Sequence, residues 1–418
     1  ARNFFFEGVE RLRPREYLTR RAGDASGEVG RYWSVDVDPL PEDVDPARRL
    51  RRRLEEVLEQ ETAPRVHAVS GGIDSSALAT VDSERYEGVT DPEILRALDR
   101  RLEIDRRTFC LDGRLPLTDP AIYRRQLAWG PHHHVDEQWL APFFEETRRR
   151  TGRQTIAVGL GGDRIWRGRP GLSVHDALAG RRWRALGRFG RRLPSRQFVK
   201  LLAGRGVALS GSRRLVELKQ AVAGGGERPV WRRPDLWVNA VDGWRGVRRS
   251  LGDLAGRGPA RRALVADRDG WPWELVGLAL HRHRCRSGVR LACPLLDPSI
   301  WTLGLRIPPD RHYGDGEQKA VLRESVRDLL PEEVVDAPKH GLFDEVVEDA
   351  LGRRRRHLVV ELFDDPLLAE TGLLEPDRFR EVFDRYCRAI ARRSEPLYGS
   401  LRIWRTIAAE LWLRALRC

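Results

Sequence analysis

The chain has 418 residues, of which 41% are hydrophobic and 33% charged, so it is long enough for a large core and more than one domain or subdomain. No apolar run is long enough to span a bilayer, and no signal sequence opens the chain, so we expect a cytoplasmic protein with no membrane partner. The five cysteines are widely spaced and include no CxxC pair, which indicates neither a disulfide framework nor a zinc site.

The formal net charge is +13, and arginine supplies 71 of the 75 basic residues. Such a surplus is typical either of a solvated basic surface or of a protein with an anionic partner, such as a nucleotide, a nucleic acid or an acidic peptide. In a chain that uses arginine by default, each of the few lysines becomes a candidate functional residue. There are four of them: Lys200, Lys219, Lys319 and Lys339.

The first half of the chain alternates strand and helix patterns. After a lead-in over residues 1–45, a helix is predicted over 46–60, because Leu50, Leu54 and Leu58 share one face. Short apolar strands are predicted at 65–70, 107–112 and from residue 154, and helical segments lie between or after them at 75–80, 120–129 and 142–152. This alternation predicts an α/β fold with a parallel sheet and helices on both faces.

The second half has a different pattern. Residues 180–270 are rich in Arg and Gly and only weakly periodic, and we interpret them as a variable insertion. From residue 271 to the end, 271–418, the pattern is mostly helical. We therefore expect one large domain over 46–418, whose C-terminal part is helical.

The stretch SGGIDSS, residues 70–76, lies between a predicted strand and a predicted helix. Glycines allow a ligand to approach the backbone, and successive N–H groups at a helix N-terminus bind anions. The carboxylate of Asp74 would repel phosphate unless a cation lay between them, so its presence predicts Mg²⁺. A simple N-cap after a glycine turn is the plainer alternative, but the two glycines followed by Asp-Ser-Ser favour phosphate binding.

SGGIDSS resembles the pyrophosphate loop of the adenylating amide ligases, which split ATP to AMP and pyrophosphate on a Rossmann-like sheet. Three further stretches resemble the asparagine-synthetase type of this superfamily, and they occur in the order expected. They are GLGGDRIWRG (159–168), CPLLDPSI (293–300) and the region 306–344, which holds a K-x-x-L-R pattern, LPEEV and a K-x-G turn. The lead-in 1–45 is similar to the linker that follows the glutaminase-like domain of that family.

The resemblance implies the ATP pyrophosphatase fold of these ligases, with ATP and Mg²⁺ as cofactors, and a role for each matching residue. Asp74 and Asp163 would bind Mg²⁺, Lys319 would contact phosphate, and Lys339 would be catalytic together with Lys319 and Asp163. The implied set of ATP- and pyrophosphate-binding residues is Ser70, Gly71, Gly72, Asp74, Ser75, Ser76, Gly161, Gly162 and Lys319.

Two departures from the family pattern bear on the substrate. The sequence contains no glutaminase domain and no N-terminal cysteine nucleophile, so we expect an amine other than glutamine-derived ammonia. In addition, Leu160 stands where asparagine synthetases have Glu and β-lactam synthetases have Tyr, and leucine can be neither a base nor a hydrogen-bond donor.

These departures favour similarity to the lasso-peptide macrolactam synthetases. Such a cyclase adenylates an Asp or Glu side chain of a precursor peptide, and the peptide's own N-terminal amine closes the ring, so that proximity replaces a dedicated base. The expected partners are the precursor peptide, a leader-processing protease and a recognition protein. An asparagine synthetase or β-lactam-synthetase-like ligase is the alternative. A tRNA-modifying enzyme is less favoured because no RNA-binding motif or catalytic cysteine pair is found.

Overall fold

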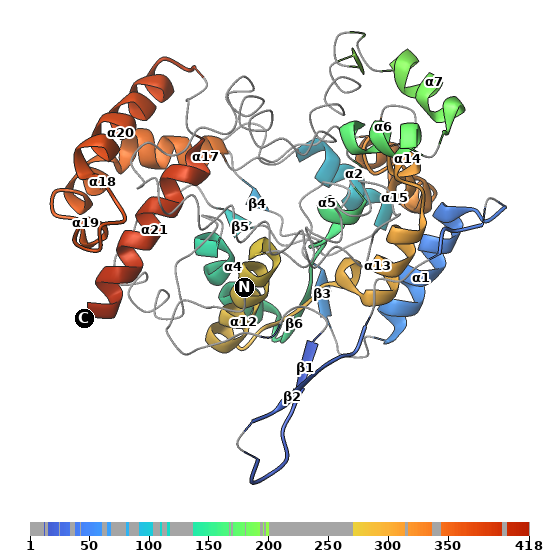
Figure 1. The fold of residues 1–418 in the computed structure, drawn as a ribbon, viewed down its shortest axis with the longest axis horizontal. Coiled ribbons are helices and arrows are strands. Elements are labelled where there is room, and N and C mark those ends of the chain that lie inside the picture. Colours follow the sequence, from blue (N-terminus) through green and yellow to red (C-terminus); the bar gives the residue numbers. More distant parts are fainter. Residues whose placement is uncertain are drawn as a thin grey trace.

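The computed structural model describes most of the chain, as the ribbon in Figure 1 shows. All structural statements below concern the described residues, which are 12, 16–24, 26–33, 38–41, 43–60, 65–67, 81–82, 92–102, 109–110, 115–117, 137–166, 168, 170–179, 181–192, 195, 198–199, 271–313, 317–336, 344–394 and 399–417. The predicted helices at 75–80 and 120–129 and nearly all of the 180–270 insertion therefore lie outside the described residues.

The described strands are short. They are β1 (Glu16–Thr19), β2 (Glu28–Arg31), β3 (Arg65–His67), β4 (Val81–Asp82), β5 (Phe109–Cys110), β6 (Thr155–Ala157) and β7 (Arg290–Ala292).

Helices make up most of the described residues. Those before residue 290 are α1 (Pro46–Gln60), α2 (Pro92–Leu102), α4 (Glu137–Thr151), α5 (Gly162–Ile165), α6 (Pro170–Ala179), α7 (Trp183–Arg192) and α12 (Trp271–Ser287). Those after it are η2 (Pro294–Leu296), α13 (Pro298–Arg306), α14 (Pro309–His312), α15 (Ala320–Val326), α16 (Glu332–Val335), α17 (Asp344–Asp349), the π-helix η4 (Ala350–Arg354), α18 (Arg356–Leu362), α19 (Leu367–Glu370), α20 (Pro376–Ala391) and α21 (Ser400–Arg417).

The sheet at the centre of the molecule is parallel, in the order β3-β6-β7. His67 lies opposite Ala157 on one side of β6, and Ala157 lies opposite Ala292 on the other. Every residue of β6 is buried, on both faces of the strand. Burial on both faces is typical of a parallel sheet covered by helices. Parallel strands β4 and β5 form a separate pair.

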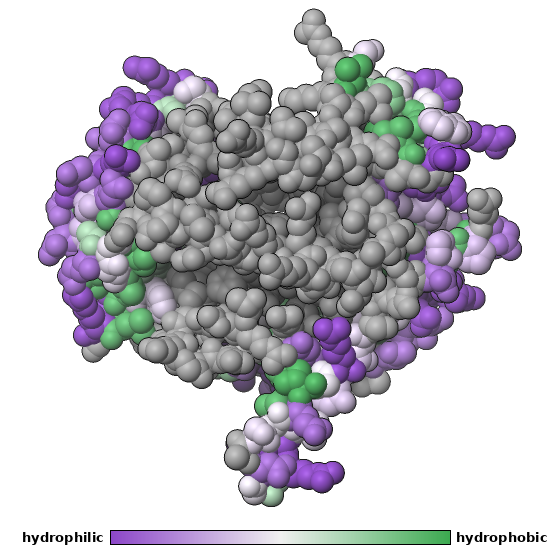
Figure 2. Space-filling model, in the orientation of Figure 1, coloured by the Kyte–Doolittle hydropathy of each residue, from purple (hydrophilic) through white to green (hydrophobic). Residues whose placement is uncertain are grey.

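The N-terminal lead-in contains an antiparallel hairpin of β1 and β2, which projects from the body of the molecule (Figure 1). Tyr17, Leu18 and Val29 are exposed on this arm, and Figure 2 shows the apolar patch where the arm meets the body. Elsewhere the flanks visible in Figure 2 are mostly hydrophilic. Among the described residues, no helix is both long enough and apolar enough to cross a membrane.

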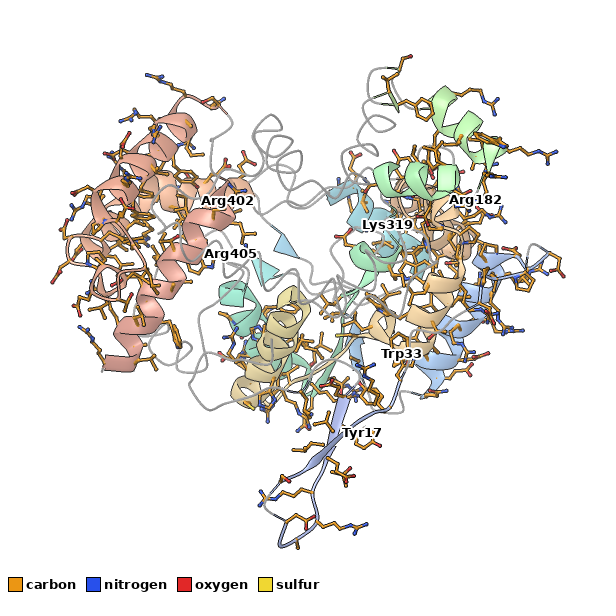
Figure 3. All side chains as sticks on the ribbon, viewed as in Figure 1. Tyr17, Trp33, Arg182, Lys319, Arg402 and Arg405 are labelled. Carbon is orange, nitrogen blue, oxygen red and sulfur yellow. The ribbon has the colours of Figure 1, made fainter. Side chains whose placement is uncertain are left out.

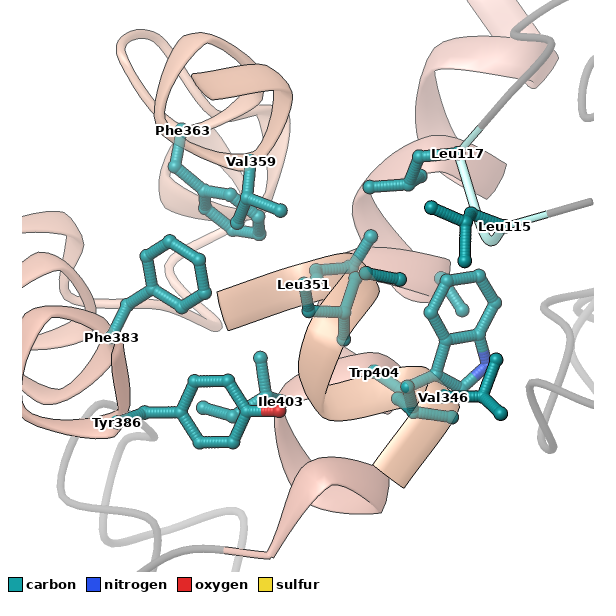
Figure 4. Packing of buried hydrophobic residues seen from close by; sticks show 14 of the residues in the cluster. Leu115, Leu117, Val346, Leu351, Val359, Phe363, Phe383, Tyr386, Ile403 and Trp404 are labelled. Atoms are coloured by element: carbon teal, nitrogen blue, oxygen red, sulfur yellow. The ribbon is translucent and has the colours of Figure 1, made fainter. Parts of the chain in front are cut away.

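Two hydrophobic clusters account for most of the core. The first, which we call the bundle core, joins one face of the sheet to the C-terminal helices: Ile156 of β6 shares it with Phe379 of α20 and Trp404 of α21. Figure 4 shows part of this cluster, including Phe363, Phe383 and Trp404. The second, the site core, packs α1 against α13 and α15 through residues such as Leu50, Trp301 and Leu322.

The described elements are compatible with the predicted α/β class. The helix predicted over 46–60 is confirmed by α1, and Leu50 is its fully buried residue. The mostly helical region after residue 271 is also confirmed, except that β7 (Arg290–Ala292) interrupts it and extends the parallel sheet. Three adjoining parallel strands are described, so the more specific Rossmann-like ATP pyrophosphatase fold stays a prediction.

Candidate functional site

The glycine turn after β6 is held in a conformation that only glycine adopts easily. The N–H of Val158 donates to the carbonyl of Ala292 at 2.9 Å, which continues the β6–β7 pairing past the strand. Gly161 then takes a φ of 110° and precedes α5. A Cβ at this position would come within 2.6 Å of Leu296 Cδ2 and 3.1 Å of the carbonyl oxygen of Leu295. Both the dihedral angle and the close approach therefore require glycine.

This close approach joins two of the motifs found in the sequence. The turn at 159–162 lies against η2, which is formed by the motif at 293–300. Asp297 of the same motif begins α13: its Oδ1 accepts the backbone N–H of Ser299 at 2.8 Å, and Pro298 occupies the first helical position. The Asp-Pro-Ser sequence is a strong helix-start signal. The motif at 293–300 thus supports the glycine turn from behind.

Asp163 and Lys319 come together at this turn. Asp163 lies in the first turn of α5, and its Oδ1 is 3.0 Å from Nζ of Lys319, which is labelled in Figure 3. The lysine side chain is only 8% exposed, whereas that of the aspartate is 45% exposed. A buried ammonium needs an opposite charge or hydrogen-bond acceptors nearby, and the Asp163 carboxylate supplies one.

The backbone of Lys319 is strained. It is the N-cap residue of α15 and has a φ of 62°, in the left-handed region. For a residue other than glycine this conformation costs about 1–2 kcal/mol. Such outliers collect at functional sites, where the surrounding structure imposes them. A strained and buried lysine that pairs with a half-exposed carboxylate is therefore a candidate catalytic feature.

The two residues of the pair can bind different ligands: the Asp163 carboxylate can bind a cation, and the Lys319 ammonium can bind a phosphate. A carboxylate oxygen is the ligand type that Mg²⁺ prefers, and the exposed part of Asp163 presents one to solvent. The Lys319 ammonium can offset negative charge on phosphate oxygens. Within the described part of the chain, no group of three or more His, Cys, Asp or Glu side chains could hold a metal by itself. A cation at Asp163 would therefore need ligands from outside these residues.

Comparison with known proteins identifies the family. The family model for asparagine synthase matches residues 142–414, about two thirds of the chain. The chain belongs to the asparagine synthase family. A search of curated proteins finds no match. Membership of this family supports ATP-dependent amide ligase activity in general and ATP as a substrate.

In this member of the asparagine synthase family, Leu160 occupies an apolar environment. The side chain is half-buried and packs against the bundle core, immediately before Gly161. Leucine has no acid–base group, and this packing gives it a structural role.

The other predicted site residues lie outside the described residues. Lys339 falls in the segment 337–343, and the predicted phosphate loop, Ser70, Gly71, Gly72, Asp74, Ser75 and Ser76, follows directly after β3. β3 and β6 are parallel neighbours, so the chain leaves both strands at the same edge of the sheet. That edge is where ligands bind in open α/β sheets. Of the predicted set, the structure thus brings together Gly161, Gly162, Asp163 and Lys319.

A supporting layer behind α5 was not predicted from the sequence. His312 is 1% exposed and its Nε2 is 2.9 Å from the carbonyl oxygen of Gly304. Its ring lies 5.5 Å from that of the buried Trp166. Gly304 leaves room for Ile165, since a Cβ there would come 2.5 Å from Ile165 Cδ1. A sequence pattern does not reveal such contacts, because each depends on residues far apart in the chain.

The thiol of Cys293, which lies next to this site, is unreactive. Burial raises its pKa to about 12, against a small opposing effect of Arg290. A thiol that stays protonated is a poor nucleophile and a poor metal ligand. Cys293 therefore belongs to the packing behind the site.

Proposed function

We propose that this chain is an AMP-forming, ATP-dependent cyclase that joins the N-terminal amine of a precursor peptide to an Asp or Glu side chain of the same peptide. The observation that carries the proposal is the Asp163–Lys319 pair on the glycine turn after β6, beside a leucine that offers no acid or base. The pair fits the handling of a charged nucleotide. The leucine fits a substrate whose reacting groups are brought together by the peptide itself.

The first step is adenylation. An oxygen of the substrate carboxylate attacks the α-phosphorus of ATP, a new P–O bond forms, and the bond to the β-phosphate breaks as pyrophosphate leaves. Ser70, Gly71, Gly72, Ser75 and Ser76 would donate hydrogen bonds to the phosphates, and Lys319 would offset charge on the departing pyrophosphate.

Asp74 and Asp163 would hold Mg²⁺, which supplies charge neutralisation of the phosphates when bound. The donor chemistry fits, because Asp163 presents a half-exposed carboxylate 3.0 Å from the lysine that would lie next to the nucleotide. Without a nucleotide, the same lysine and carboxylate compensate each other.

The second step forms the amide. The peptide's N-terminal amine attacks the acyl carbon, AMP leaves, and the amine nitrogen loses a proton. Lys339 would stabilise the developing oxyanion. A prefolded peptide that holds amine and acyl carbon together removes much of the entropic barrier, so a base at the position of Leu160 becomes dispensable. A leader-processing protease and a recognition protein would supply that peptide.

Exchange of radiolabelled pyrophosphate into ATP tests the proposal. We expect exchange with linear peptides that carry Asp or Glu several residues from a free N-terminus, and none with aspartate or small β-amino acids. Lys319→Ala should abolish it, whereas Lys200→Ala, in a lysine outside every motif, should not. Exchange with aspartate alone would instead establish a small-molecule amide ligase, which the family match also allows.

A further inference from the structure

Arg323 makes hydrogen bonds to two separate stretches of backbone. It lies in α15 and is half-buried. Its Nε donates to the carbonyl of Gln318 at 3.0 Å, and its Nη1 donates to the carbonyl of Val335. Its backbone N–H also donates to the carbonyl of Lys319 at 2.9 Å. One arginine thus contacts the residue before Lys319, Lys319 itself, and the end of α16.

The side-chain contact with Gln318 fixes the peptide group before Lys319, and the ordinary backbone hydrogen bond from residue 323 fixes the one after it. The carbonyl of Gln318 belongs to the peptide plane on the N-terminal side of Lys319, and the carbonyl of Lys319 belongs to the plane on its C-terminal side. Rotation about φ and ψ of Lys319 changes the angle between these two planes. Holding both carbonyls therefore holds the left-handed conformation, with a φ of 62°, that Lys319 would not adopt by itself.

The contact with Val335 fixes the end of α16. Val335 is the last residue of that helix, and the N–H of Asp336 donates to the carbonyl of Glu332 at 2.8 Å to close it. Anchoring the Val335 carbonyl therefore ties the end of α16 to α15, next to Lys319.

We propose that Arg323 is a positioning residue that ties the backbone before Lys319 to the end of α16 and so holds Lys319 in its left-handed conformation. The significance of Lys319 rests on the proposed function, whereas the positioning itself rests only on the contacts of Arg323. Arginine suits this task because its planar fork places several N–H donors in fixed directions. A lysine at the same position has a single point of charge and no Nε–H along the side chain.

Arg327 provides a matched control, since it lies one turn further along the chain and pairs with exposed acidic side chains. It pairs with Glu324 at 3.3 Å and with Asp336 at 3.4 Å, and both acidic side chains are exposed. Arg323→Gln and Arg327→Gln remove the same charge from the same region. Only the first removes side-chain hydrogen bonds to the backbone carbonyls of Gln318 and Val335.

The decisive experiment measures lysine reactivity, because the chain has only four lysines and each can be followed by mass spectrometry. The protein is treated with limiting acetic anhydride, and acetylation of each lysine is quantified. In the wild type Lys319 should be protected, being 6% exposed. Arg323→Gln should raise the acetylation rate of Lys319 about tenfold or more, and Arg327→Gln should leave it unchanged.

Arg323→Lys guards against a variant that fails to fold, because it keeps the charge and loses only the fork. It should resemble Arg323→Gln in lysine reactivity while it keeps the wild-type circular dichroism spectrum. Unchanged acetylation of Lys319 in both folded variants would overturn the proposal. This readout needs no substrate, so its failure is distinguishable from a failure of the cyclase proposal.

Kinetics separate positioning from a purely structural role. In pyrophosphate exchange, Arg323→Lys should lower kcat about a hundredfold, since small misplacements of reacting groups have effects of this size, with little change in the KM for ATP. Added guanidinium should restore part of the activity of Arg323→Ala. An equal loss in Arg327→Gln, or a change confined to thermal stability, would contradict the role in positioning.

Discussion

The C-terminal helical bundle and the region around the glycine turn differ in the kind of side chain that they bury. In the bundle, α20 and α21 bury rows of apolar residues, and the rings of Phe363 and Phe379 lie tilted against each other with centroids 4.1 Å apart. Near the turn, by contrast, Gly161 and Lys319 both adopt positive φ angles, and a lysine is buried. Positive φ angles also occur in the bundle, at Leu117 and at Arg393 just after α20, so the distinctive feature near the turn is a positive φ combined with a buried charge at Lys319.

The difference indicates which region carries the chemistry. Sequences fold when local preference and tertiary packing agree, and natural proteins depart from that agreement mainly at functional sites. Even the buried charge of the bundle is fully compensated: both oxygens of Glu410 accept backbone N–H groups at the start of α19, at 3.0 and 2.9 Å, and Arg414 pairs with it. That arrangement is a helix cap and explains itself structurally. The strained Lys319 has no comparable structural explanation.

The comparison predicts first that Lys319 supports activity at the expense of stability. Lys319→Ala should reduce pyrophosphate exchange by about three orders of magnitude, because it removes a cation from the site of developing negative charge. Lys319→Gly should be equally inactive but about 1 kcal/mol more stable than Lys319→Ala, since glycine adopts the positive φ freely. Exchange assays and urea unfolding of the two variants check both parts. Equal stabilities would show that the strain is not real.

The bundle should respond in the opposite way. Phe379 is 1% exposed and lies between Phe363 and Phe383, so Phe379→Ala leaves a large cavity. We expect a loss of about 3–5 kcal/mol in the free energy of unfolding. Turnover per folded molecule at low temperature should stay near that of the wild type. Phe379→Leu, which retains more of the volume, is the milder control. A specific loss of activity without destabilisation would place the bundle in the site after all.

A pair of glycine variants separates backbone strain from close approach. Gly152 and Gly161 both have positive φ angles, of 66° and 110°, but a Cβ at Gly152 would meet nothing within 4 Å. Gly152→Ala should therefore cost about 1–2 kcal/mol from the dihedral angle alone. Gly161→Ala should cost about 1–3 kcal/mol more, because η2 must move away from the turn. Thermal denaturation of both variants measures the difference, and equal costs would mean that η2 yields freely.

The same contrast explains how much could be predicted from the sequence. The helix over 46–60 and the helices after residue 271 follow from apolar periodicity, because an amphipathic helix is specified by residues close together in the chain. β7 (Arg290–Ala292) was missed: three residues are too short for a period-two pattern, and its partner β6 lies far away in sequence. Strand pairing of this kind is decided by tertiary contacts.

The candidate site residues were predicted for a different reason. Asp163 and Lys319 came from resemblance to a family, and their roles stay predictions. Nothing in their local sequence would have indicated that their side chains lie 3.0 Å apart. The left-handed conformation of Lys319 was not foreseen either, since a lysine there runs against its own preference. The role of Arg323 was also missed. It lies within the K-x-x-L-R pattern, yet its hydrogen bonds to Gln318 and Val335 require the fold.

The smallest expected effect concerns the buried cysteines of the two regions, one behind the glycine turn and one in the bundle. Burial raises the pKa of Cys293 to about 12 and that of Cys387 to about 11, whereas Cys285 on α12 is exposed. The thiolate is the reactive form, and an ordinary cysteine has a pKa of about 8.5. At about pH 9, iodoacetamide should alkylate Cys285 because it is exposed, while Cys293 and Cys387 should stay protected until the protein unfolds. Mass spectrometry of alkylated peptides, with a urea-unfolded sample as the control, distinguishes the three. Rapid alkylation of Cys293 in the folded protein would mean that the packing behind the glycine turn opens to solvent, and the rigid support inferred for the site would then be wrong.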